Sequence, residues 1–226
     1  MGQCAQVPKD FYDKITHQKL ADKGYGLEEL GLVVLFSGNG SNMQNIIESL
    51  HDRYYLHDTQ KVQLKILACI TNNPAAYGIK RCESLGIKCE VLSHKDFSCR
   101  EDFDRALSGL VEGYCPVLVV LAGFMRVLTP VFTQKHRCIN IHPSLLPRHK
   151  GAQAIRDSYE SAEDFGGVSV HWVNEVLDGG ALILQESVPK IAGESFESFE
   201  NRIHQLEYAL YPRAILEALG LREGGV

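Results

Sequence analysis

The sequence predicts an α/β fold: a doubly wound, Rossmann-like, mostly parallel sheet with helices on both faces and a long C-terminal helix. Two observations predict this fold. Short apolar runs alternate with segments of helical periodicity from residue 31 onward, as crossovers between parallel strands require. Several of the runs are continuously apolar, which is typical of strands covered on both faces. Ligands bind beyond the carboxyl ends of the strands in such sheets, so functional residues are expected there.

The alternation begins after a mixed, polar segment. Residues 1–30 are expected to form an arm or an extra helix, followed by one domain over residues 31–226. The strands expected in the first half are its short apolar runs, 32–36, 65–70 and 88–92. The helices expected between them repeat apolar residues every three or four positions, from Met43 to Leu50 and from residue 76 to Gly86. Glycine commonly ends a helix, which fixes the second boundary.

The second half continues the pattern. Residues 99–114 place Phe103, Leu107 and Val111 on one helical face. The expected strands are the apolar or alternating runs 117–123, 138–141, 167–173 and 181–189. The last helix begins near Ser195, and its apolar residues again recur every three or four positions. Pro212 is expected to kink or interrupt this helix, because proline lacks the N–H that the helix needs.

The composition excludes several classes of protein. A net charge of -5 over 226 residues does not fit a nucleic-acid-binding protein, whose affinity comes from clustered Lys and Arg. The seven cysteines are scattered without CxxC spacing, which favours reduced thiols over a disulfide framework or a zinc site. The polar start and the short apolar runs predict neither a signal peptide nor a membrane span. We therefore expect a cytoplasmic protein that binds small molecules and no metal, nucleic acid or membrane.

The first strand end carries a candidate anion site. In SGNGSN (37–42), Gly38 and Gly40 permit a sharp turn and a close approach to a ligand. Ser41 or Asn42 is expected to cap the following helix, whose free N–H groups and dipole favour an anion. The dinucleotide fingerprint G-x-G-x-x-G fails at Met43, so a lone phosphate is favoured over a dinucleotide. The alternative is a tight strand-to-helix turn with no ligand.

A second strand end carries candidate catalytic groups. Asn140 and His142 lie two residues apart on an expected strand, so both side chains project from one side. An amide donor beside an imidazole can stabilise an oxyanion and move a proton. Pro143 and Pro147 are expected to stiffen the loop that follows. Asp178, in the turn LDGG, can orient His142 if it reaches it. The alternatives are a buried polar pair and ordinary turn chemistry for Asp178.

Five motifs together resemble the phosphoribosylglycinamide formyltransferases, which are folate-dependent enzymes of purine synthesis. INIHPSLLP (139–147) and LDGG (177–180) mark the wider superfamily of enzymes that use 10-formyltetrahydrofolate. SGNGSN and GFMR favour the glycinamide ribonucleotide branch. The resemblance covers about residues 31–218 and rests on these motifs: VVLFSGNGSN (33–42), VLAGFMRVLTP (120–130), INIHPSLLP, GVSVHWVNEVLDGG (167–180) and HQLEYALYP (204–212).

The resemblance implies transfer of a formyl group from 10-formyltetrahydrofolate to the amine of glycinamide ribonucleotide, without a metal. It implies a catalytic trio of Asn140, His142 and Asp178. The residues implied to bind the ribotide are Gly40, Ser41 and Asn42 at its phosphate and His204, Gln205, Leu206 and Glu207 near its amine. The residues implied to bind the folate are Arg100, Met125, Arg126, Val127, Leu128, Asn140, Asn174, Glu175, Val176, Leu177 and Asp178.

The mechanism that the resemblance implies is a direct attack. The amine attacks the formyl carbon, and Asn140 and His142 stabilise the oxyanion that forms. Asp178 holds His142 and helps to relay the proton, through water, to the nitrogen that leaves.

Two features depart from the family pattern. The segment RHKGAQAI (148–155) replaces an expected loop rich in glycine and aromatic residues, and its basic residue before Gly-Ala is closer to the transfer-RNA and deformylase relatives. The arm over residues 1–30 has no assigned role. Three alternatives stay open: methionyl-tRNA formyltransferase, expected to carry a basic C-terminal domain; formyltetrahydrofolate deformylase, expected to carry a longer N-terminal domain; and a non-catalytic relative that binds ligands. The sequence does not predict the oligomeric state.

Overall fold

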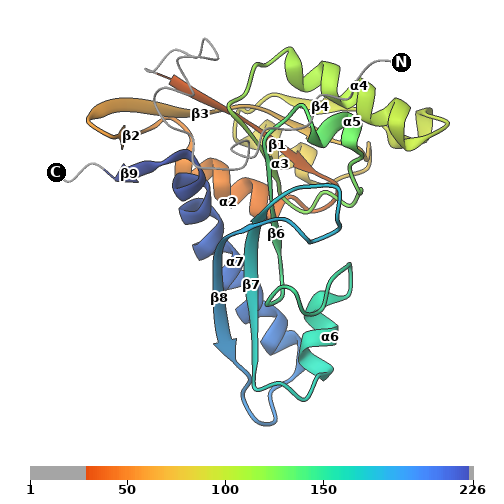
Figure 1. The fold of residues 1–226 in the computed structure, drawn as a ribbon, viewed down its shortest axis with the longest axis vertical. Helices are drawn as coiled ribbons and strands as arrows, with labels where there is room; N and C mark the ends of the chain where they lie inside the picture. The colour runs from red at the N-terminus through yellow and green to blue at the C-terminus, as the bar shows by residue number, and fades with distance from the viewer. Residues whose placement is uncertain (1–28, 224–226) are drawn as a thin grey trace.

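The computed structural model describes residues 29–223, and its elements follow the expected alternation of strands and helices (Figure 1). The strands are β1 (Glu29–Phe36), β2 (Arg53–His57), β3 (Gln60–Thr71), β4 (Cys89–Val91), β5 (Leu118–Leu121), β6 (Cys138–His142), β7 (Phe165–Trp172), β8 (Leu182–Pro189) and β9 (Leu221–Glu223). The helices are α2 (Ser41–Leu50), α3 (Gly78–Ser84), η2 (His94–Asp96), α4 (Arg100–Glu112), α5 (Pro130–Thr133), α6 (Ala154–Glu160) and α7 (Phe196–Leu219). The predicted arm lies outside the described residues, except for Glu29 and Leu30, which begin β1.

One sheet joins all of these strands in the order β8-β7-β6-β5-β1-β3-β2-β9, with β4 beside the carboxyl half of β3. The central strands β6, β5, β1, β3 and β4 are parallel. The outer strands β7 and β8 at one end, and β2 and β9 at the other, run antiparallel. The predicted doubly wound, mostly parallel architecture is therefore confirmed for the centre of the sheet.

Alternate side chains of β1 enter two cores, one on each face of the sheet. Leu32, Val34 and Phe36 pack with residues of α2, α3 and α7. Val33 and Leu35 pack with residues of α4 and α5. All five side chains are fully buried, which explains why the run reads as continuously apolar. The long helix α7 lies along the face that also carries α2 (Figure 1).

The antiparallel edge at β2 and β9 was not predicted. β2 pairs with the first half of β3 through a hairpin, and β9 adds to β2 after α7 ends at Gly220. The β2 segment, RYYLH, is short and half polar, because only alternate residues such as Tyr55 are buried at this edge. A short edge strand therefore leaves little periodic signal in the sequence.

Pro212 does not interrupt α7, contrary to the expectation from the sequence. The helix is assigned continuously from Phe196 to Leu219. Proline at position 212 removes the N–H that would bond the carbonyl of Tyr208. The side-chain amide of Asn45, on α2, donates to that carbonyl instead, at 2.9 Å. A donor from a neighbouring helix thus satisfies the group that the proline leaves free.

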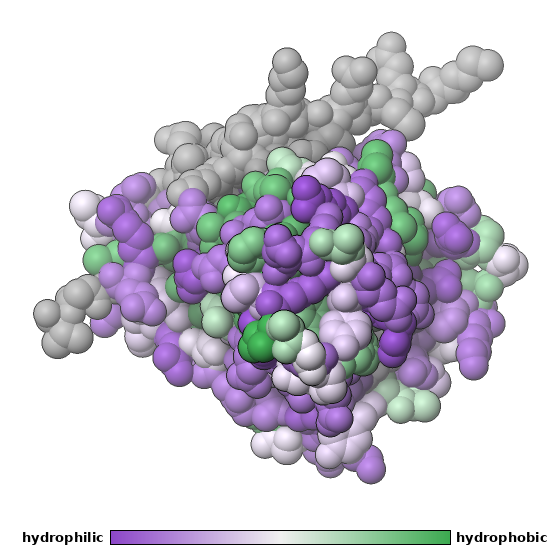
Figure 2. Space-filling view, turned by 90° about the horizontal axis from the view of Figure 1, so that it is seen from below, coloured by the Kyte–Doolittle hydropathy of each residue, from purple (hydrophilic) through white to green (hydrophobic). Residues whose placement is uncertain are grey.

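The face of the molecule at the α6 end is mainly polar (Figure 2). Figure 2 views the end of the molecule that carries α6 and shows mostly hydrophilic side chains with scattered apolar ones. No helix within residues 29–223 combines the length and hydropathy that a membrane crossing requires. The apolar residues are used instead to fill the two layers between sheet and helices.

A buried imidazole lies between α4 and the segment after α5. His136 packs on the Phe132 ring with centroids 4.5 Å apart, and its Nε2 lies 2.8 Å from the Ser108 hydroxyl. Burial lowers the pKa of His136 to about 4 from its ordinary 6.5. In the folded protein this ring therefore stays neutral down to about pH 4. In the unfolded chain the same ring takes up a proton below pH 6.5.

We predict that His136 makes the folded state less stable in mild acid. Between pH 6.5 and about 4 the unfolded state binds more protons at this residue, so the free energy of unfolding falls as the pH falls. The slope reaches roughly 1.4 kcal/mol per pH unit for one proton. Urea titrations of wild type and His136→Gln should show a shallower acid slope in the variant, and parallel curves would contradict the prediction.

Candidate functional site

The two strands on which the topology turns, β1 and β5, end side by side. The Ser37 amide donates to the Gly123 carbonyl at 3.1 Å, and the Met125 amide donates to the Ser37 hydroxyl at 2.8 Å. In the sheet, β3 lies on one side of β1 and β5 lies on its other side, so the chain changes direction across the sheet after β1. A crevice is expected at such a switch point in a doubly wound sheet. Two adjoining pockets occupy it and share Gly123, Met125 and Arg126.

The first, the apolar pocket, encloses about 390 Å³ and lies between the segment after β5, the end of β6 and the loop after β7. Most of the residues predicted to bind folate line it. Its lining includes Met125, Arg126, Val127, Leu128, Asn140, His142, Gly151, His171, Asn174, Val176, Leu177 and Asp178. The exposed side chains of Met125 and Val176 stand on opposite segments at its edge. The pocket thus offers apolar walls with a few polar groups at one end.

The second, the glycine-loop pocket, encloses about 510 Å³ around Ser37–Asn42. Its lining includes the predicted Gly40, Ser41 and Asn42, together with Asn72, Asn73, His94, Lys95 and Arg126. The described residues that line it include no Asp or Glu, and its charged members are the cations Lys95 and Arg126. A chain with a net charge of -5 therefore presents a positive pocket at a helix N-terminus.

The helix that begins at this pocket is not capped as the sequence predicted. Its N-cap is Gly40, in a left-handed conformation with φ 75°, and no side chain caps it, so the expected cap by Ser41 or Asn42 is wrong. A Cβ on residue 40 would lie 2.9 Å from the Gly78 backbone, which explains why glycine is required. The loop is fixed from outside by Arg81, whose Nε donates to the Asn39 carbonyl at 2.9 Å. The first N–H groups of α2 thus stay uncapped by any side chain and available to an anion.

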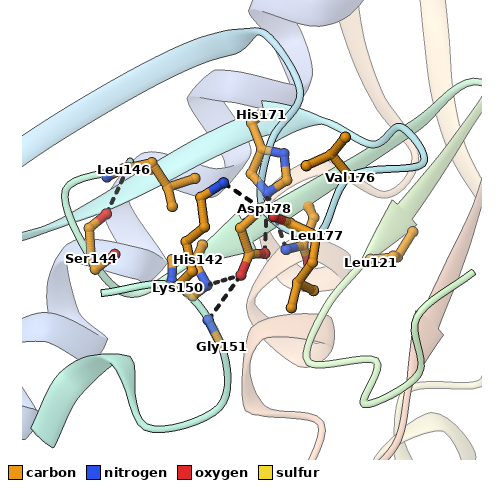
Figure 3. Close-up of polar contacts among 12 residues, drawn as sticks. Leu121, His142, Ser144, Leu146, Lys150, Gly151, His171, Val176, Leu177 and Asp178 are labelled. Carbon is orange, nitrogen blue, oxygen red and sulfur yellow. Dashed lines mark hydrogen bonds and ion pairs between the residues drawn. The ribbon is translucent and has the colours of Figure 1, made fainter. Parts of the chain in front are cut away.

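Asp178 and three residues of β6 and β7 form the polar end of the apolar pocket (Figure 3). His142 Nδ1 lies 3.6 Å from Asp178 Oδ2, and His171 Nε2 lies 3.8 Å from Oδ1. These are ion-pair separations, longer than hydrogen bonds. The Gly151 amide donates to Oδ2 at 3.0 Å. The carboxylate, 8% exposed, is therefore held between one backbone N–H and two imidazoles.

The partners of His171 indicate its tautomer. Its Nδ1 lies 2.8 Å from the Trp172 carbonyl, so Nδ1 carries the proton and donates. Its Nε2 then accepts from Asn140 Nδ2 at 3.3 Å. Burial lowers the pKa of His171, and the nearby charge of Asp178 opposes that shift. A neutral His171 thus orients the Asn140 amide with its nitrogen toward β7.

The turn at Asp178 depends on its two glycines. Asp178 itself has φ 49°, a conformation that few non-glycine residues adopt. A Cβ on Gly180 would lie 1.7 Å from the Trp172 carbonyl, and one on Gly179 would lie 2.5 Å from the Val176 side chain. The sequence LDGG is therefore required for the chain to return toward β8 with the carboxylate turned inward.

Hydrogen bonds tie the loop from Pro143 to Gly151 to the neighbouring strands. The Ser169 hydroxyl donates to the Ser144 carbonyl at 2.6 Å and accepts from the Leu146 amide at 3.0 Å. His142 Nε2 lies 2.9 Å from the His149 carbonyl and donates to it. The Leu146–Pro147 bond is cis. Ser169, two residues before His171 on β7, thus supports the loop and is not among the residues that line the apolar pocket.

Several predicted site residues lie outside the linings of both pockets. Arg100 is exposed at the start of α4, and Glu175 is exposed and accepts from Gln134 at 3.1 Å. On α7, Gln205 is exposed and Leu206 is half-buried. Glu207 is buried and pairs with His204 Nδ1 at 2.6 Å, and this hydrogen bond raises the pKa of His204. The structure therefore brings together the three residues predicted to be catalytic and the loop residues predicted to bind folate, but not these six.

Sequence reasoning missed part of the glycine-loop pocket and part of the apolar pocket. Asn72 and Asn73 follow β3, so the rule of strand ends could have indicated them. His94 and Lys95 lie in the short η2 helix and left no motif. Gly151 belongs to the unusual loop at 148–155, where its backbone N–H, not its side chain, is what contacts Asp178. Within residues 29–223, no group of three or more potential ligands is arranged to hold a metal ion.

Comparisons with known proteins agree with one another. The model of the formyl transferase family matches residues 30–215. A phosphoribosylglycinamide formyltransferase of Escherichia coli (strain K12) is 40% identical over 82% of this chain and 85% of its own length. A crystal structure of phosphoribosylglycinamide formyltransferase from Campylobacter jejuni is 45% identical, covers 85% of this chain and 98% of its own, and superposes with a TM-score of 0.80. The human trifunctional purine biosynthetic protein adenosine-3 is 37% identical over 81% of this chain and 18% of its own length.

We predict that the glycine-loop pocket binds phosphate and that Gly40 is essential for it. Gly40→Ala forces an L residue into the left-handed region and against Gly78. The dissociation constant for ribose 5-phosphate should rise roughly tenfold by calorimetry. Gly38→Ala is the matched control, because its Cβ would meet nothing within 4 Å. Equal affinities in both variants, each melting as wild type, would contradict a phosphate site at this loop.

Proposed function

Because this chain belongs to the formyl transferase family, we infer that it transfers a formyl group from 10-formyltetrahydrofolate to the amine of glycinamide ribonucleotide, in de novo purine synthesis. The relatives from Escherichia coli and Campylobacter jejuni are both named phosphoribosylglycinamide formyltransferase. The observation that carries the inference to this chain is the placement of Asn140, His142 and Asp178 at the polar end of the apolar pocket, beside a positive, glycine-lined pocket.

The two pockets suit the two substrates. The apolar walls at Met125, Val127 and Leu177 suit the flat ring of a folate, and residues 125–128, which also line the pocket, offer backbone groups to its edge. The uncapped start of α2, with Lys95 across the pocket, suits the phosphate of a ribotide. Because the pockets adjoin at Gly123 and Met125, the two ligands meet beside Asn140.

In the reaction, the amine nitrogen of the ribotide forms a bond to the formyl carbon, and the bond from that carbon to folate N10 breaks. The formyl oxygen carries negative charge in between. One Nδ2 hydrogen of Asn140 is engaged by His171, and the other donates to this oxygen. The proton that the amine loses passes to N10, through water held by Asp178. The products are formylated ribotide and tetrahydrofolate.

His142 has a defined part in this scheme. Its Nε2–H is the donor that faces the His149 carbonyl in the structure, and its Nδ1 faces Asp178. The formyl oxygen replaces the His149 carbonyl as the acceptor when the donor substrate is bound. The negative charge of Asp178, 3.6 Å from Nδ1, stabilises the positive charge that builds up on the ring as the oxyanion develops. Asp178 thus acts on the oxyanion through His142.

The alternative acceptors make different demands. Transfer RNA requires many phosphate contacts, which the net charge of -5 does not provide. Hydrolysis of the donor requires no acceptor pocket, whereas here a positive pocket adjoins the reactive end. A non-catalytic relative has no need of the buried Asp178 and its two imidazoles. The compared relatives are named as glycinamide ribonucleotide enzymes, which favours the same conclusion.

The purified protein should release tetrahydrofolate from 10-formyltetrahydrofolate only when glycinamide ribonucleotide is present. The release is followed by absorbance, with the formylated ribotide identified by mass spectrometry. Release with water alone would indicate a deformylase instead. Formylation of charged initiator transfer RNA, with none of the ribotide, would indicate the transfer-RNA branch.

We predict that Asn140 and His142 act on the chemical step and not on binding. His142→Ala should lower kcat by roughly 10²–10³, because its Nε2–H donor to the oxyanion is lost. Asn140→Ala should lower kcat by about 10²–10³, because one oxyanion donor is lost. The KM values for both substrates should change little by comparison. Variants that fold as wild type and keep near-native kcat would remove these residues from the mechanism.

A further inference from the structure

Three consecutive residues of the unusual loop 148–155 each contact the polar end of the apolar pocket. The His149 carbonyl accepts from His142 Nε2 at 2.9 Å. The Lys150 ammonium donates to the Leu177 carbonyl at 3.3 Å. The Gly151 amide donates to Asp178 Oδ2 at 3.0 Å. Two of these contacts come from the backbone, which any sequence supplies, so Lys150 is the only one of the three whose side chain makes the contact.

We propose that Lys150 is a positioning residue of the formyl-transfer site: its ammonium ties the 148–151 loop to Leu177 and places a positive charge beside Asp178. The inference rests on the proposed function. Figure 3 shows the Lys150 side chain extending toward Leu177 and Asp178, from the opposite side to His171. Leu177 immediately precedes Asp178, so its carbonyl belongs to the peptide that sets the direction of the catalytic carboxylate.

The loop that Lys150 holds also forms the wall of the apolar pocket. Asn174, Val176 and Leu177 line that pocket, and Val176 and Leu177 are exposed. Within this segment, the Val176 amide donates to Asn174 Oδ1 at 2.9 Å, and the Gly179 amide donates to the Val176 carbonyl at 3.1 Å. From other parts of the chain, Gln134 donates to Glu175 at 3.1 Å and the Gly151 amide donates to Asp178. Lys150 adds a connection at Leu177 itself, between these two, so losing it should loosen the wall against which the folate packs.

The charge of Lys150 acts on the same cluster. Burial is the main cause that lowers the pKa of His171, and the positive charges of His142 and Lys150 lower it further, against the opposing effect of Asp178. The other charged side chains of this loop face elsewhere. Arg148 and His149 both pair with Glu163, at 3.0 and 3.1 Å. Lys150 is therefore the cation of the 148–151 loop that faces Asp178, His142 and His171.

The direction of the charge effect does not depend on which protonation state is active. The Lys150 cation is one of the charges that lower the pKa of His171. Removing it raises that pKa, so the limb of the pH–rate profile that His171 sets moves to higher pH. The ammonium is exposed to solvent, so the shift should be modest and sensitive to salt. This signature separates an electrostatic role from a purely structural one.

The test uses three substitutions that separate the hydrogen bond from the charge. Lys150→Met removes both, Lys150→Gln keeps a donor, and Lys150→Arg keeps a donor and the charge. Lys150→Met should raise the KM for 10-formyltetrahydrofolate by roughly three- to tenfold and leave the KM for the ribotide within about twofold. The limb of its pH–rate profile that His171 sets should move up by about half a unit at low salt. The difference should shrink near 1 M salt, where the Debye length is about 3 Å.

The other variants and a control decide the interpretation. Lys150→Gln should keep a near-native folate KM while showing the shift of the pH profile, and Lys150→Arg should restore both. Lys61→Met is the matched control, because Lys61 lies over the Tyr54 ring at the β2–β3 hairpin, outside both pocket linings. Calorimetry with tetrahydrofolate gives a readout that is independent of turnover, and Lys150→Met should weaken its binding.

A Lys150→Met protein with wild-type folate KM, tetrahydrofolate affinity and pH profile would overturn the proposal. A larger effect on the ribotide KM than on the folate KM would overturn it as well, and so would a failure of Lys150→Arg to restore the pH profile. These outcomes all require a wild-type enzyme that transfers formyl groups. A wild type that does not would overturn the proposed function instead, so the two failures are distinguishable.

Discussion

The buried carboxylate of Asp178 is the constraint on which the rest of the site depends. A charge removed from water is costly unless donors meet it. Here the Gly151 N–H donates to the carboxylate, the His142 ring lies 3.6 Å from it, and the neutral His171 ring lies 3.8 Å away on its other oxygen. Each partner comes from a different part of the chain. His142 lies at the end of β6, His171 lies on β7, and Gly151 belongs to the loop between these strands. The antiparallel register of β6 with β7 sets Asn140 opposite His171, so the amide and the carboxylate share one imidazole.

The sheet places this cluster where two ligands can meet. β1 and β5 end together at the switch point, and the chain segments after them form the shared edge of the apolar and the glycine-loop pockets. The antiparallel pair β7 and β8 then extends the sheet and returns the LDGG turn to the open end of the apolar pocket. A parallel core thus supplies the strand ends, and an antiparallel hairpin supplies the carboxylate that we propose is catalytic.

The sequence predicted the elements whose signal is local. Continuous apolar runs indicated the central strands. The separation of two residues between Asn140 and His142 placed both side chains on one side of β6. The contacts that depend on tertiary structure were not predictable in this way. Pro212 leaves the Tyr208 carbonyl without its helical donor, and the Asn45 side chain supplies one from α2, 163 residues earlier in the sequence. Lys150 stood out as an unusual residue, but its contact with Leu177 depends on two loops that meet only in the folded protein.

The central claim is that Asp178 acts through His142, and a double-mutant cycle on the chemical step tests it most directly. Single-turnover rates of formyl transfer are measured for wild type, Asp178→Asn, His142→Ala and the double variant. Residues that act as one unit lose activity non-additively. The account predicts that the double variant is within about threefold of His142→Ala alone. Losses that multiply, with the double variant slower than His142→Ala by the full factor of Asp178→Asn, would contradict it.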